Sequence, residues 1–514
     1  MTRIAKPVLA PLVVIVAFAE YCFAANILIL GLPYYSHLAG IAKVGKYLQS
    51  QGHDVRITIP PQLEERLQDC GVKPLLYHCL GEFPEQHKLG RAMWKEVLES
   101  PSFFSTSASD GLLILNQVAT KIIRDTKLQK NIETFKPDLI LLDSSRIAVM
   151  LTLIPYKLNI PFAMFGSPAF PQCTRAPILP TVIPYRYSTY TFQMTFLERV
   201  SNTFMNLAFY RQSVFINSSL ISEYLPDEPY ISLIDLQAKA QLWIVRQHSM
   251  LDYNKPLMPN VKRIPHLLDL TPKPLPQEFQ SFLESAENGI VLVSFGSVVL
   301  NFMPAQIKDK LLQAFTRTKY KFIIQSSLQQ KNQSHKFISR KWLPQFDLLR
   351  HKKTKLFITH CGSNGVTEAV TAGVPIIGFP LFADQPYNAV SMQKNGFGLK
   401  LEIKLFSVDE LVSAIEEVVT NPSYKSKVEK ASAIFQSERV PPIEEAAYWI
   451  NHVLKFGGDH LRSYAQDIPL WKYLGLDIIA FCLFLWHVVV YLVITLLRCC
   501  LSRCCGSKQK VKDE

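Results

Sequence analysis

Short apolar runs alternate with longer stretches of helical spacing through the first half of the chain. Residues 26–30 form an apolar run, about 38–51 have the spacing of an amphipathic helix, and 55–59 form a second run. Buried-strand patterns follow at 136–144 and 160–165. Apolar strands separated by helices are typical of a parallel sheet covered by helices. The pattern therefore predicts an α/β domain.

The second half repeats this pattern. Apolar runs at residues 289–297, 320–326, 354–360 and 374–380 alternate with helical stretches. Between the halves, residues 254–276 contain six prolines and are unsuited to a helix or an interior strand. We therefore expect two α/β domains facing each other across a cleft, with a ligand at the carboxyl ends of the strands.

The amino-terminal end has the features of a secretory signal peptide, which we assign to residues 1–24. Arg3 and Lys6 are its basic region, residues 8–18 its apolar core and residues 22–24 a cleavage site. An uncleaved anchor is the alternative, but the apolar run is short for one. The predicted domains follow as residues 25–265 (amino-terminal domain), 266–284 (linker) and 285–455 (carboxyl-terminal domain).

The carboxyl-terminal end predicts a membrane span. We assign residues 456–475 to a juxtamembrane segment, 476–498 to a transmembrane helix and 499–514 to a cytosolic tail. A buried core helix is the alternative, although such a helix is rarely apolar on every face. Arg498 ends the span and four more Lys and Arg residues follow it, which favours a single-pass type I protein with a lumenal body.

Composition narrows the location and the partners. Lys510 and Lys512 stand near the carboxyl end, a placement that resembles a dilysine signal for endoplasmic reticulum membrane proteins. The body has few cysteines, so the fold depends on hydrophobic cores, while Asn217 and Asn332 lie in glycosylation sequons. The net charge of +13 is spread along the chain without a basic-aromatic nucleic-acid motif, so we expect no nucleic-acid partner.

The stretch FITHCGSNGVTEAV, residues 357–370, carries the clearest chemistry. An apolar run ends at His360, and Gly362, Ser363, Asn364 and Gly365 open a helical segment. Backbone N–H groups at a helix start lack partners and lie at the positive end of its dipole, so such a junction suits a diphosphate. The first βα loop lacks the GxGxxG spacing, which disfavours a dinucleotide oxidoreductase.

The stretch from Trp342 to Gln385, WLPQFDLLRHKKTKLFITHCGSNGVTEAVTAGVPIIGFPLFADQ, closely resembles the signature of UDP-glycosyltransferases, in particular the animal UDP-glucuronosyltransferases. Weaker similarity covers nearly the whole chain. The resemblance implies a GT-B fold, with two Rossmann-like domains facing a cleft: an amino-terminal acceptor domain and a carboxyl-terminal donor domain. It also implies sugar transfer from a UDP-sugar with inversion, without a metal or other cofactor.

The resemblance also implies a set of donor-binding residues. It places Trp342 and Gln345 at the uracil and ribose, and His360, Gly362, Ser363 and Asn364 at the diphosphate. Glu368, one helical turn after Asn364, is suited to ribose hydroxyls. Two further groups complete the set: Asp384 and Gln385 for sugar hydroxyls, and Ser297 for a phosphate. An isolated Trp, Glu or Asp–Gln pair is usually structural, so these assignments depend on the full signature.

Catalysis requires a base that deprotonates an acceptor hydroxyl. His37, expected in the loop after the first strand, and Asp143, at the end of another strand, match the histidine and carboxylate of the family. A carboxylate beside an imidazole fixes its tautomer and stabilises its protonated form. Either residue alone is as well explained by a capping role, whereas the two together favour catalysis.

One departure leaves the donor sugar open. Vertebrate drug-conjugating relatives typically carry a second histidine where this chain has Asn364, and some relatives with asparagine use other sugars. We expect glucuronic acid, or a hexose such as glucose, to be transferred to a small lipophilic acceptor. Residues 177–194, rich in Pro, Tyr and Phe, would line the acceptor pocket or simply pack. A non-catalytic lumenal binding protein is the alternative function, and homo- or hetero-oligomers remain open.

Overall fold

The computed structural model describes residues 24–80, 110–145, 148–166, 170–215, 218–267, 271–296, 303–326 and 335–506. The chain divides into two compact units, one ending at Arg462 and one beginning at Ser463. The predicted signal peptide up to residue 23, Ser297, the sequon residues Asn217 and Asn332, and residues 507–514 lie outside the described ranges.

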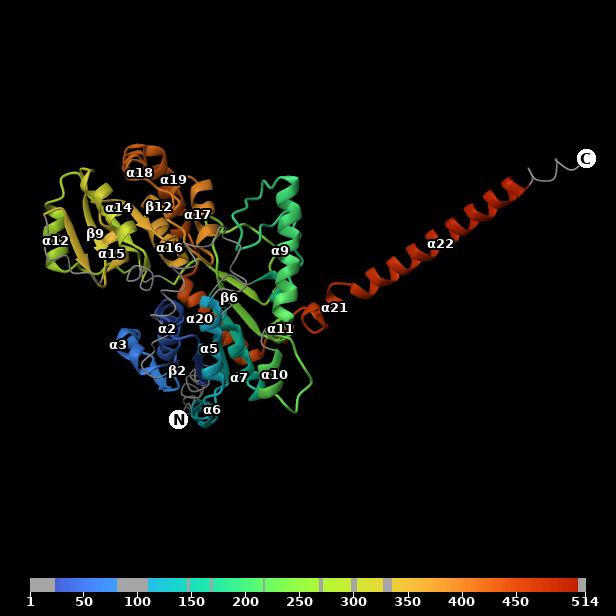
Figure 1. Cartoon of the computed structure of the whole chain (residues 1–514). Coiled ribbons are helices and arrows are strands. Elements are labelled where there is room, and N and C mark those ends of the chain that lie inside the picture. The colour runs from blue at the N-terminus through green and yellow to red at the C-terminus, as the bar shows by residue number, and fades with distance from the viewer. Residues whose placement is uncertain are drawn as a thin grey trace, which may run out of the picture. The chain divides into compact units, whose positions relative to one another are not determined.

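The described residues of the amino-terminal half form a seven-stranded sheet in the order β3-β2-β1-β4-β5-β6-β7, and all its neighbouring strands pair in parallel (Figure 1). The strands are β1 (Asn26–Leu30), β2 (Asp54–Ile59), β3 (Lys73–Leu76), β4 (Leu139–Asp143), β5 (Phe162–Gly166), β6 (Leu242–Arg246) and β7 (Val261–Ile264). The helices are α2 (Tyr35–Ser50), α3 (Glu64–Leu67), α5 (Asp110–Ile123), α6 (Thr126–Phe135), α7 (Leu153–Lys157), α8 (Pro171–Thr174), α9 (Phe196–Phe215), α10 (Ser218–Tyr224) and α11 (Leu233–Ala238).

The apolar runs form this sheet because a central parallel strand is covered on both faces. β1 and β4 are almost completely buried, and Ile27 stands opposite Leu139. One side of α2 buries Leu38, Ile41 and Leu48 in the same core. A fully buried side chain of this size contributes roughly 1.5–3 kcal/mol of transfer free energy, so burial fixes the register of α2 on the sheet.

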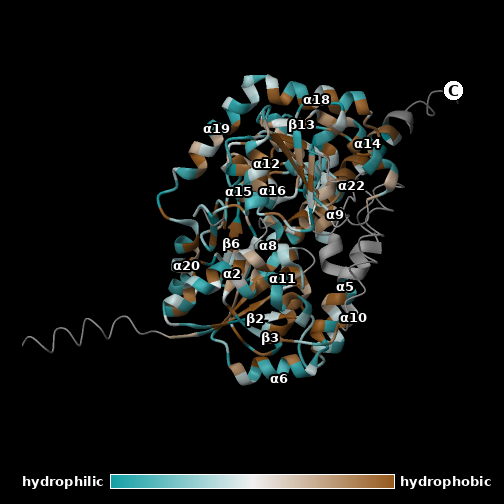
Figure 2. Ribbon diagram, turned by 90° about the vertical axis from the view of Figure 1, so that its left-hand side faces the viewer, coloured by the Kyte–Doolittle hydropathy of each residue, from teal (hydrophilic) through white to brown (hydrophobic). Residues whose placement is uncertain are grey.

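The described part of the second half forms a six-stranded parallel sheet in the order β10-β9-β8-β11-β12-β13. In Figure 2 the strands of each half are mostly hydrophobic (brown), whereas the helices around them carry both hydrophobic and hydrophilic residues. The strands are β8 (Ile290–Ser294), β9 (Lys321–Gln325), β10 (Phe337–Arg340), β11 (Thr354–Thr359), β12 (Ile376–Gly378) and β13 (Gly398–Lys400). The helices of this region are α12 (Gln277–Glu284), α14 (Ala305–Thr316), α15 (Gln345–Arg350), α16 (Ser363–Thr371), α17 (Gln385–Lys394), α18 (Val408–Thr420) and α19 (Pro422–Gln436).

These two sheets with their helices are called the amino-terminal and carboxyl-terminal lobes below. The two-sheet α/β architecture predicted from the sequence is confirmed. The proline-rich segment 254–276 contains one strand, β7, which stands last in the order of the first sheet. The position agrees with the expectation that this segment avoids interior strands.

Helix α20 (Pro442–Phe456) crosses back to the amino-terminal lobe. Its residues Ala446, Ala447, Ile450 and Val453 are buried in the core formed by the first sheet and α2. Asn451 Nδ2 donates to Gln51 Oε1 at 2.8 Å. The range expected for the second domain, residues 285–455, thus ends with a helix that packs on the first lobe.

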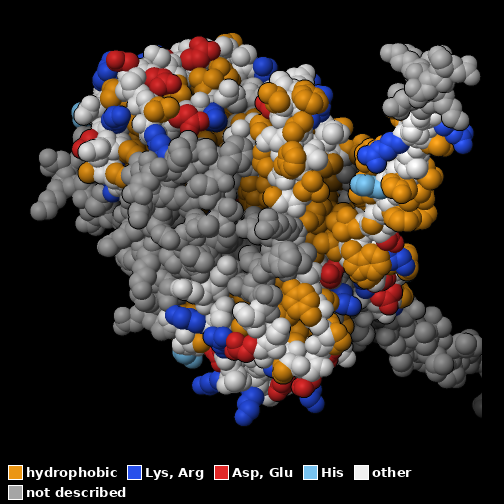
Figure 3. Space-filling model, turned by 45° about the vertical axis from the view of Figure 1, so that its right-hand side comes forward, with side chains coloured by type: hydrophobic (Ala, Val, Ile, Leu, Met, Phe, Trp, Pro, Cys, Tyr) orange, Lys and Arg blue, Asp and Glu red, His pale blue; other side chains and the backbone are white. Residues whose placement is uncertain are grey.

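Helix α9 presents hydrophobic side chains to solvent. Figure 3 shows apolar side chains along this helix, where Phe196, Leu197 and Phe204 are each about two-thirds or more exposed. Leu207 continues the stripe one turn further on. These side chains take no part in the core of the lobe.

The second unit is mainly one long helix, α22 (Leu476–Gly506), preceded by the short helix α21 (Leu470–Tyr473). Residues Leu476–Arg503 of α22 have a mean hydropathy of 2.5 over their most apolar window, and the side chains of that window are not buried in the protein. By length and composition this helix is suited to span a membrane, as the sequence predicts.

Candidate active site

The candidate site residues stand at the carboxyl edges of the two sheets. His37 follows β1, Asp143 ends β4 and Arg246 ends β6, while His360 follows β11 and Asp384 follows β12. Because the carboxyl ends of parallel strands share one edge of a sheet, each lobe gathers its polar groups on one side. The local folding of the strands therefore places residues that are far apart in sequence near one another.

His37 and Asp143 form a close pair. His37 Nδ1 lies 2.6 Å from Asp143 Oδ2, and Asp143 also accepts from the backbone N–H of Ser145 at 2.9 Å and its hydroxyl at 3.0 Å. Asp143 is buried, whereas the side chain of His37 is 27% exposed. The carboxylate therefore fixes the ring through Nδ1 and leaves Nε2 for another group.

The pair shifts both pKa values. Burial opposes a charged imidazole, but the attraction and hydrogen bond of Asp143 outweigh burial and raise the pKa of His37. Burial alone would raise the pKa of Asp143, but the attraction and hydrogen bond of His37 lower it. The geometry thus favours an imidazole that accepts a proton while Asp143 stays ionised.

His37 lies in a helix rather than in the expected loop. Helix α2 begins at Tyr35, three residues before the predicted start at Leu38, because the backbone N–H groups of His37 and Leu38 already bond to the Tyr34 carbonyl. The first helical turn therefore holds His37. A helix fixes the position of its backbone more firmly than a loop would.

The junction between β11 and α16 has the geometry of an anion site. Gly362 precedes α16, and no side chain of the described residues caps this end of the helix. The first backbone N–H groups of α16 are therefore available to a ligand. His360 stands just before it, and burial lowers the pKa of His360 to about 4 although Asp384 opposes the shift. A neutral His360 is suited to donate one hydrogen bond to an anion.

Gly362 leaves space for the His360 ring in addition to preceding α16. A Cβ at Gly362 would lie 2.6 Å from His360 Nε2, and one at Gly296 would lie 3.0 Å from His360 Cε1. Gly296 also has a φ of +79°, which favours glycine. From the sequence, Gly362 was expected at the diphosphate. The structure adds that both glycines make room for the imidazole.

Asn364 connects the candidate anion site to the His37–Asp143 pair. Its Nδ2 donates to the carbonyl of Ser36, the residue before His37, at 3.4 Å, and its Oδ1 accepts from Arg246 Nη1. The diphosphate candidates and the candidate base therefore meet across the lobes.

Arg246 was missed by the sequence analysis. It is half-buried, and Nε donates to the Gly166 carbonyl at 3.4 Å. Burial lowers the pKa of Arg246, and the attraction of Asp143 and Asp384 opposes this shift. The guanidinium remains charged, because an arginine is not deprotonated in proteins. The signal was present in the sequence, because a charged residue ends the apolar run Leu242–Arg246 at the edge where ligands bind.

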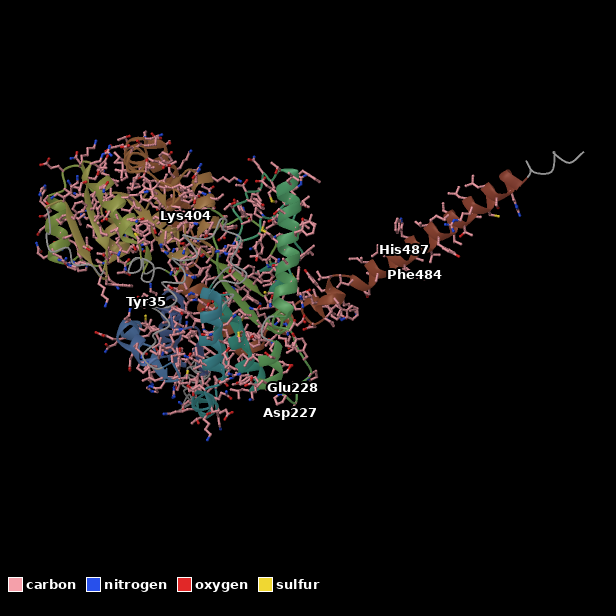
Figure 4. The ribbon with its side chains drawn as sticks, viewed as in Figure 1. Tyr35, Asp227, Glu228, Lys404, Phe484 and His487 are labelled. Carbon is pink, nitrogen blue, oxygen red and sulfur yellow. The ribbon has the colours of Figure 1, made fainter. Side chains whose placement is uncertain are left out.

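The nucleoside candidates also gather. Gln345 Nε2 donates to Glu368 Oε2 at 2.5 Å, and burial raises the pKa of Glu368 although this hydrogen bond opposes the shift. Trp342 is 53% exposed, with its ring edge-on to Tyr35 at 5.3 Å between centroids. Tyr35, labelled in Figure 4, lies where the lobes meet. An exposed indole beside a Gln–Glu pair is suited to a base and its ribose.

Asp384 and Gln385 have different surroundings. Asp384 Oδ2 accepts from Asn388 Nδ2 at 3.0 Å and lies 3.5 Å from Arg186 Nη2. Gln385 is buried, and its Oε1 accepts from the backbone N–H groups of Leu381 and Phe382. Asp384 is therefore placed to meet a ligand, while the oxygen of Gln385 holds the loop. Ser363 is partly exposed at the start of α16, and Ser297 lies outside the described residues.

The aromatic segment 177–194 takes part in packing. Tyr185 and Tyr187 contact Phe209 and Phe170 respectively, with ring centroids 6.3 and 5.6 Å apart. Phe192 packs on Tyr253 at 4.4 Å. These contacts show one of the two expected uses of the segment, and an acceptor pocket lined by it stays a prediction.

Comparison with known proteins places the chain in a family. The family model "UDP-glucoronosyl and UDP-glucosyl transferase" matches residues 29–511. The chain is 30% identical over 500 residues to mouse UDP-glucuronosyltransferase 1A9, covering 93% of this chain and 92% of the relative. It is 33% identical over 401 residues to rhesus macaque UDP-glucuronosyltransferase 2B33, covering 74% and 73%.

Solved structures agree on the fold. The glycotransferase of kitacinnamycin aligns with a TM-score of 0.60 and 18% identity, covering 84% of this chain and 99% of the other. A UDP-glucosyltransferase from Polygonum tinctorium aligns with a TM-score of 0.58 and 16% identity, with the same coverage. The two parallel-sheet lobes are those of the GT-B fold, and the chain belongs to the UDP-glucuronosyl and UDP-glucosyl transferase family of glycosyltransferase enzymes.

Proposed function

We propose that this enzyme transfers glucuronic acid from UDP-glucuronic acid to a hydroxyl of a small lipophilic acceptor, with inversion at the anomeric carbon. The observation that carries the proposal is the meeting of two groups across the lobes. The His37–Asp143 pair stands on one side, and Asn364 at the start of α16 stands on the other, in contact with Ser36 and Arg246.

In the proposed reaction, His37 Nε2 removes the proton of the acceptor hydroxyl as its oxygen attacks the anomeric carbon. The bond from that carbon to the diphosphate oxygen breaks, and UDP leaves with the electron pair. Asp143 stabilises the imidazolium that forms. A single displacement inverts the anomeric configuration, which NMR of the product would report.

Positive charge for the leaving diphosphate would come from the α16 N-terminus, with His360 and Ser363 as further donors. Trp342 would stack on the uracil, and Gln345 with Glu368 would bind the ribose. Because these groups supply the stabilisation, the proposal assigns no role to a metal or other cofactor. The rate should be unchanged by EDTA, and restoration of an EDTA-inhibited rate by a divalent cation would contradict this part.

Arg246 favours glucuronic acid over glucose as the donor sugar. It is a half-buried cation in contact with Asn364, and its charge acts on both His37 and Asp384. A carboxylate on the sugar would pair with this guanidinium, whereas the hydroxymethyl group of glucose would offer it no charge.

A donor panel tests the proposal. Initial rates of the full-length protein in microsomal membranes would be measured with UDP-glucuronic acid and UDP-glucose and a simple phenol. We expect UDP-glucuronic acid to be preferred, and Arg246→Met to reduce that preference by about tenfold or more, the value of a lost charge-assisted hydrogen bond. A wild-type preference for UDP-glucose would overturn the choice of sugar.

We further propose that the protein is a single-pass type I protein of the endoplasmic reticulum membrane with lumenal lobes. The apolar α22 and the basic residues after it support this orientation. Glycosidase-sensitive mass at Asn217 or Asn332, together with protease protection of the lobes in sealed microsomes, would agree. Digestion of the lobes in sealed microsomes would contradict the orientation.

A further inference from the structure

Arg186 is a nearly buried cation that none of the proposed steps uses. It lies in the segment between α8 and α9 of the amino-terminal lobe, and its side chain is 11% exposed. Its guanidinium carbon lies 5.0 Å from the ring centre of Tyr387 on α17 of the carboxyl-terminal lobe. The side chain therefore reaches across the lobes.

Two carboxylates share this guanidinium. Arg186 Nη1 donates to Asp252 Oδ1 at 2.8 Å, and Nη2 lies 3.5 Å from Asp384 Oδ2. Burial opposes the charge of Arg186, but the attraction of Asp252 and Asp384 outweighs it and raises the pKa of the guanidinium. Arg186 consequently stays charged while it holds Asp384 from the opposite lobe.

The surroundings hold Arg186 in place. Tyr253, one residue after Asp252, contacts Tyr387 with its ring at 5.2 Å and donates its backbone N–H to the Tyr387 hydroxyl at 3.3 Å. The Tyr253 hydroxyl donates to the carbonyl of Tyr190 in the segment that carries Arg186. A guanidinium fixed in this way acts as a pre-organised fork rather than a mobile surface charge.

The contact selects one oxygen of Asp384. Both Arg186 and Asn388 approach Oδ2, so among the described residues Oδ1 is the oxygen left for a sugar hydroxyl. Ala383, directly before Asp384, has a φ of +55°, a conformation that needs support from its surroundings. The orientation of Asp384 is therefore set by contacts from both lobes.

We propose that Arg186 is a positioning residue for donor-sugar recognition: from the amino-terminal lobe it orients Asp384 so that Oδ1 meets a hydroxyl of the transferred sugar. The inference rests on the proposed function, because that function assigns Asp384 to the sugar. It makes recognition of the sugar dependent on the acceptor-side lobe, while recognition of the UDP part is independent of Arg186.

Equilibrium binding of UDP-glucuronic acid and of UDP separates these two parts of the donor. Both would be measured on the full-length protein in detergent, in a His37→Ala background that slows turnover. Arg186→Met keeps the apolar stem and removes the charge. We expect it to weaken UDP-glucuronic acid binding by about 10- to 100-fold, the worth of a hydrogen bond between charged groups, and UDP binding by less than about 3-fold.

Two variants serve as controls for folding and for charge. Arg186→Lys should recover part of the lost affinity, because an ammonium can pair with one carboxylate but does not span two. Arg124→Met breaks an exposed ion pair with Glu223, 2.6 Å long and in the same lobe, and should leave both affinities unchanged.

A double-variant cycle tests whether Arg186 acts through Asp384. In an Asp384→Asn background, Arg186→Met should weaken UDP-glucuronic acid binding by less than about 3-fold more, because neighbouring groups in one network are not additive. Equal losses for UDP and UDP-glucuronic acid, or full additivity with Asp384→Asn, would overturn the inference. Because the readout is binding, failure of His37 as the base would leave the inference standing.

Discussion

The two lobes share one architecture but assemble their site residues differently. In the carboxyl-terminal lobe, the described candidate residues come from one stretch between Trp342 and Gln385, which includes β11, α16 and β12. In the amino-terminal lobe, the candidate residues come from four separate places: the first turn of α2 (His37), the ends of β4 and β6 (Asp143 and Arg246), and the segment between α8 and α9 (Arg186). The proposed donor side is thus built from one local stretch of the chain, whereas the proposed acceptor side requires the whole first sheet.

The difference also appears in how each half is supported. Two of the candidate donor residues, Gln345 and Glu368, hold each other within the carboxyl-terminal lobe. The acceptor-side residues depend on distant partners: His37 on Asp143, and Arg246 on Asn364 of the opposite lobe. Changes to the His37–Asp143 pair should therefore reduce the rate, whereas changes at the β11–α16 junction should reduce UDP affinity.

The sharpest test of this comparison is His37→Ala. Loss of a general base typically costs ~10² to 10⁴ in rate, so we expect kcat to fall by that factor. UDP affinity should be unchanged, because the proposed diphosphate site lies on the other lobe. Initial rates and equilibrium UDP binding would be measured on the same preparation. A variant that keeps near wild-type kcat would remove His37 from the proposed reaction.

Gly362→Ala, unlike His37→Ala, should mainly weaken UDP binding. Its Cβ would lie 2.6 Å from His360 Nε2, so the imidazole must move and UDP affinity should fall by roughly tenfold, within the usual cost of overpacking. The matched control is Gly365→Ala on the same helix, where the nearest side-chain atom would be 3.4 Å away. If both variants bind UDP equally well, His360 is not held by the space at Gly362.

The pH profile sharpens the comparison further. Because the pKa of His37 is raised above its usual 6.5, kcat/KM should fall on acidification at a pH above that value as the base becomes protonated. Asp143→Asn removes the attraction to the imidazolium, so burial and the charge of Arg246 should lower the pKa of His37. The acid limb of the residual activity should therefore move to lower pH. An acid limb at the same pH in both proteins would contradict the pairing.

The smallest effect is expected on the outer surface of α9. Leu197 is 74% exposed, so Leu197→Lys should change the free energy of unfolding by no more than about 0.5 kcal/mol and leave UDP affinity as it is. Denaturant unfolding and UDP binding provide the measurements. A larger loss of stability would show that the stripe packs against another part of the protein.

The sequence predicted eight of the described strands because apolar runs of about five residues are strong local signals, whereas β3, β6, β7, β10 and β13 were not expected. Residues 26–30 and 354–359 are strands as expected, within one residue. The start of α2 was missed by three residues, since the helix begins with Tyr34 carbonyl contacts rather than with an apolar residue. Helix boundaries depend on such capping contacts more than on periodicity.

The site was predicted only where its residues adjoin in sequence or match the family. His360 and Asn364 were found together because the junction is continuous, and His37 with Asp143 because the family pairs them. Arg246 and Arg186 were not found, since their importance comes from contacts with Asn364 and Asp384 more than a hundred residues away. The packing of Gly362 against His360 likewise needs coordinates.

Helix α20 restricts how halves of this enzyme can be exchanged with those of a relative. Four of its residues, Ala446, Ala447, Ile450 and Val453, complete a core whose other members precede residue 268. A chimera joined only in the proline-rich segment would pair one parent's sheet with the other parent's closing helix, leaving mismatched volumes in a close-packed interior. A chimera with two crossovers, one in the proline-rich segment and one just before Pro442, would take all residues of each hydrophobic core from the same parent protein.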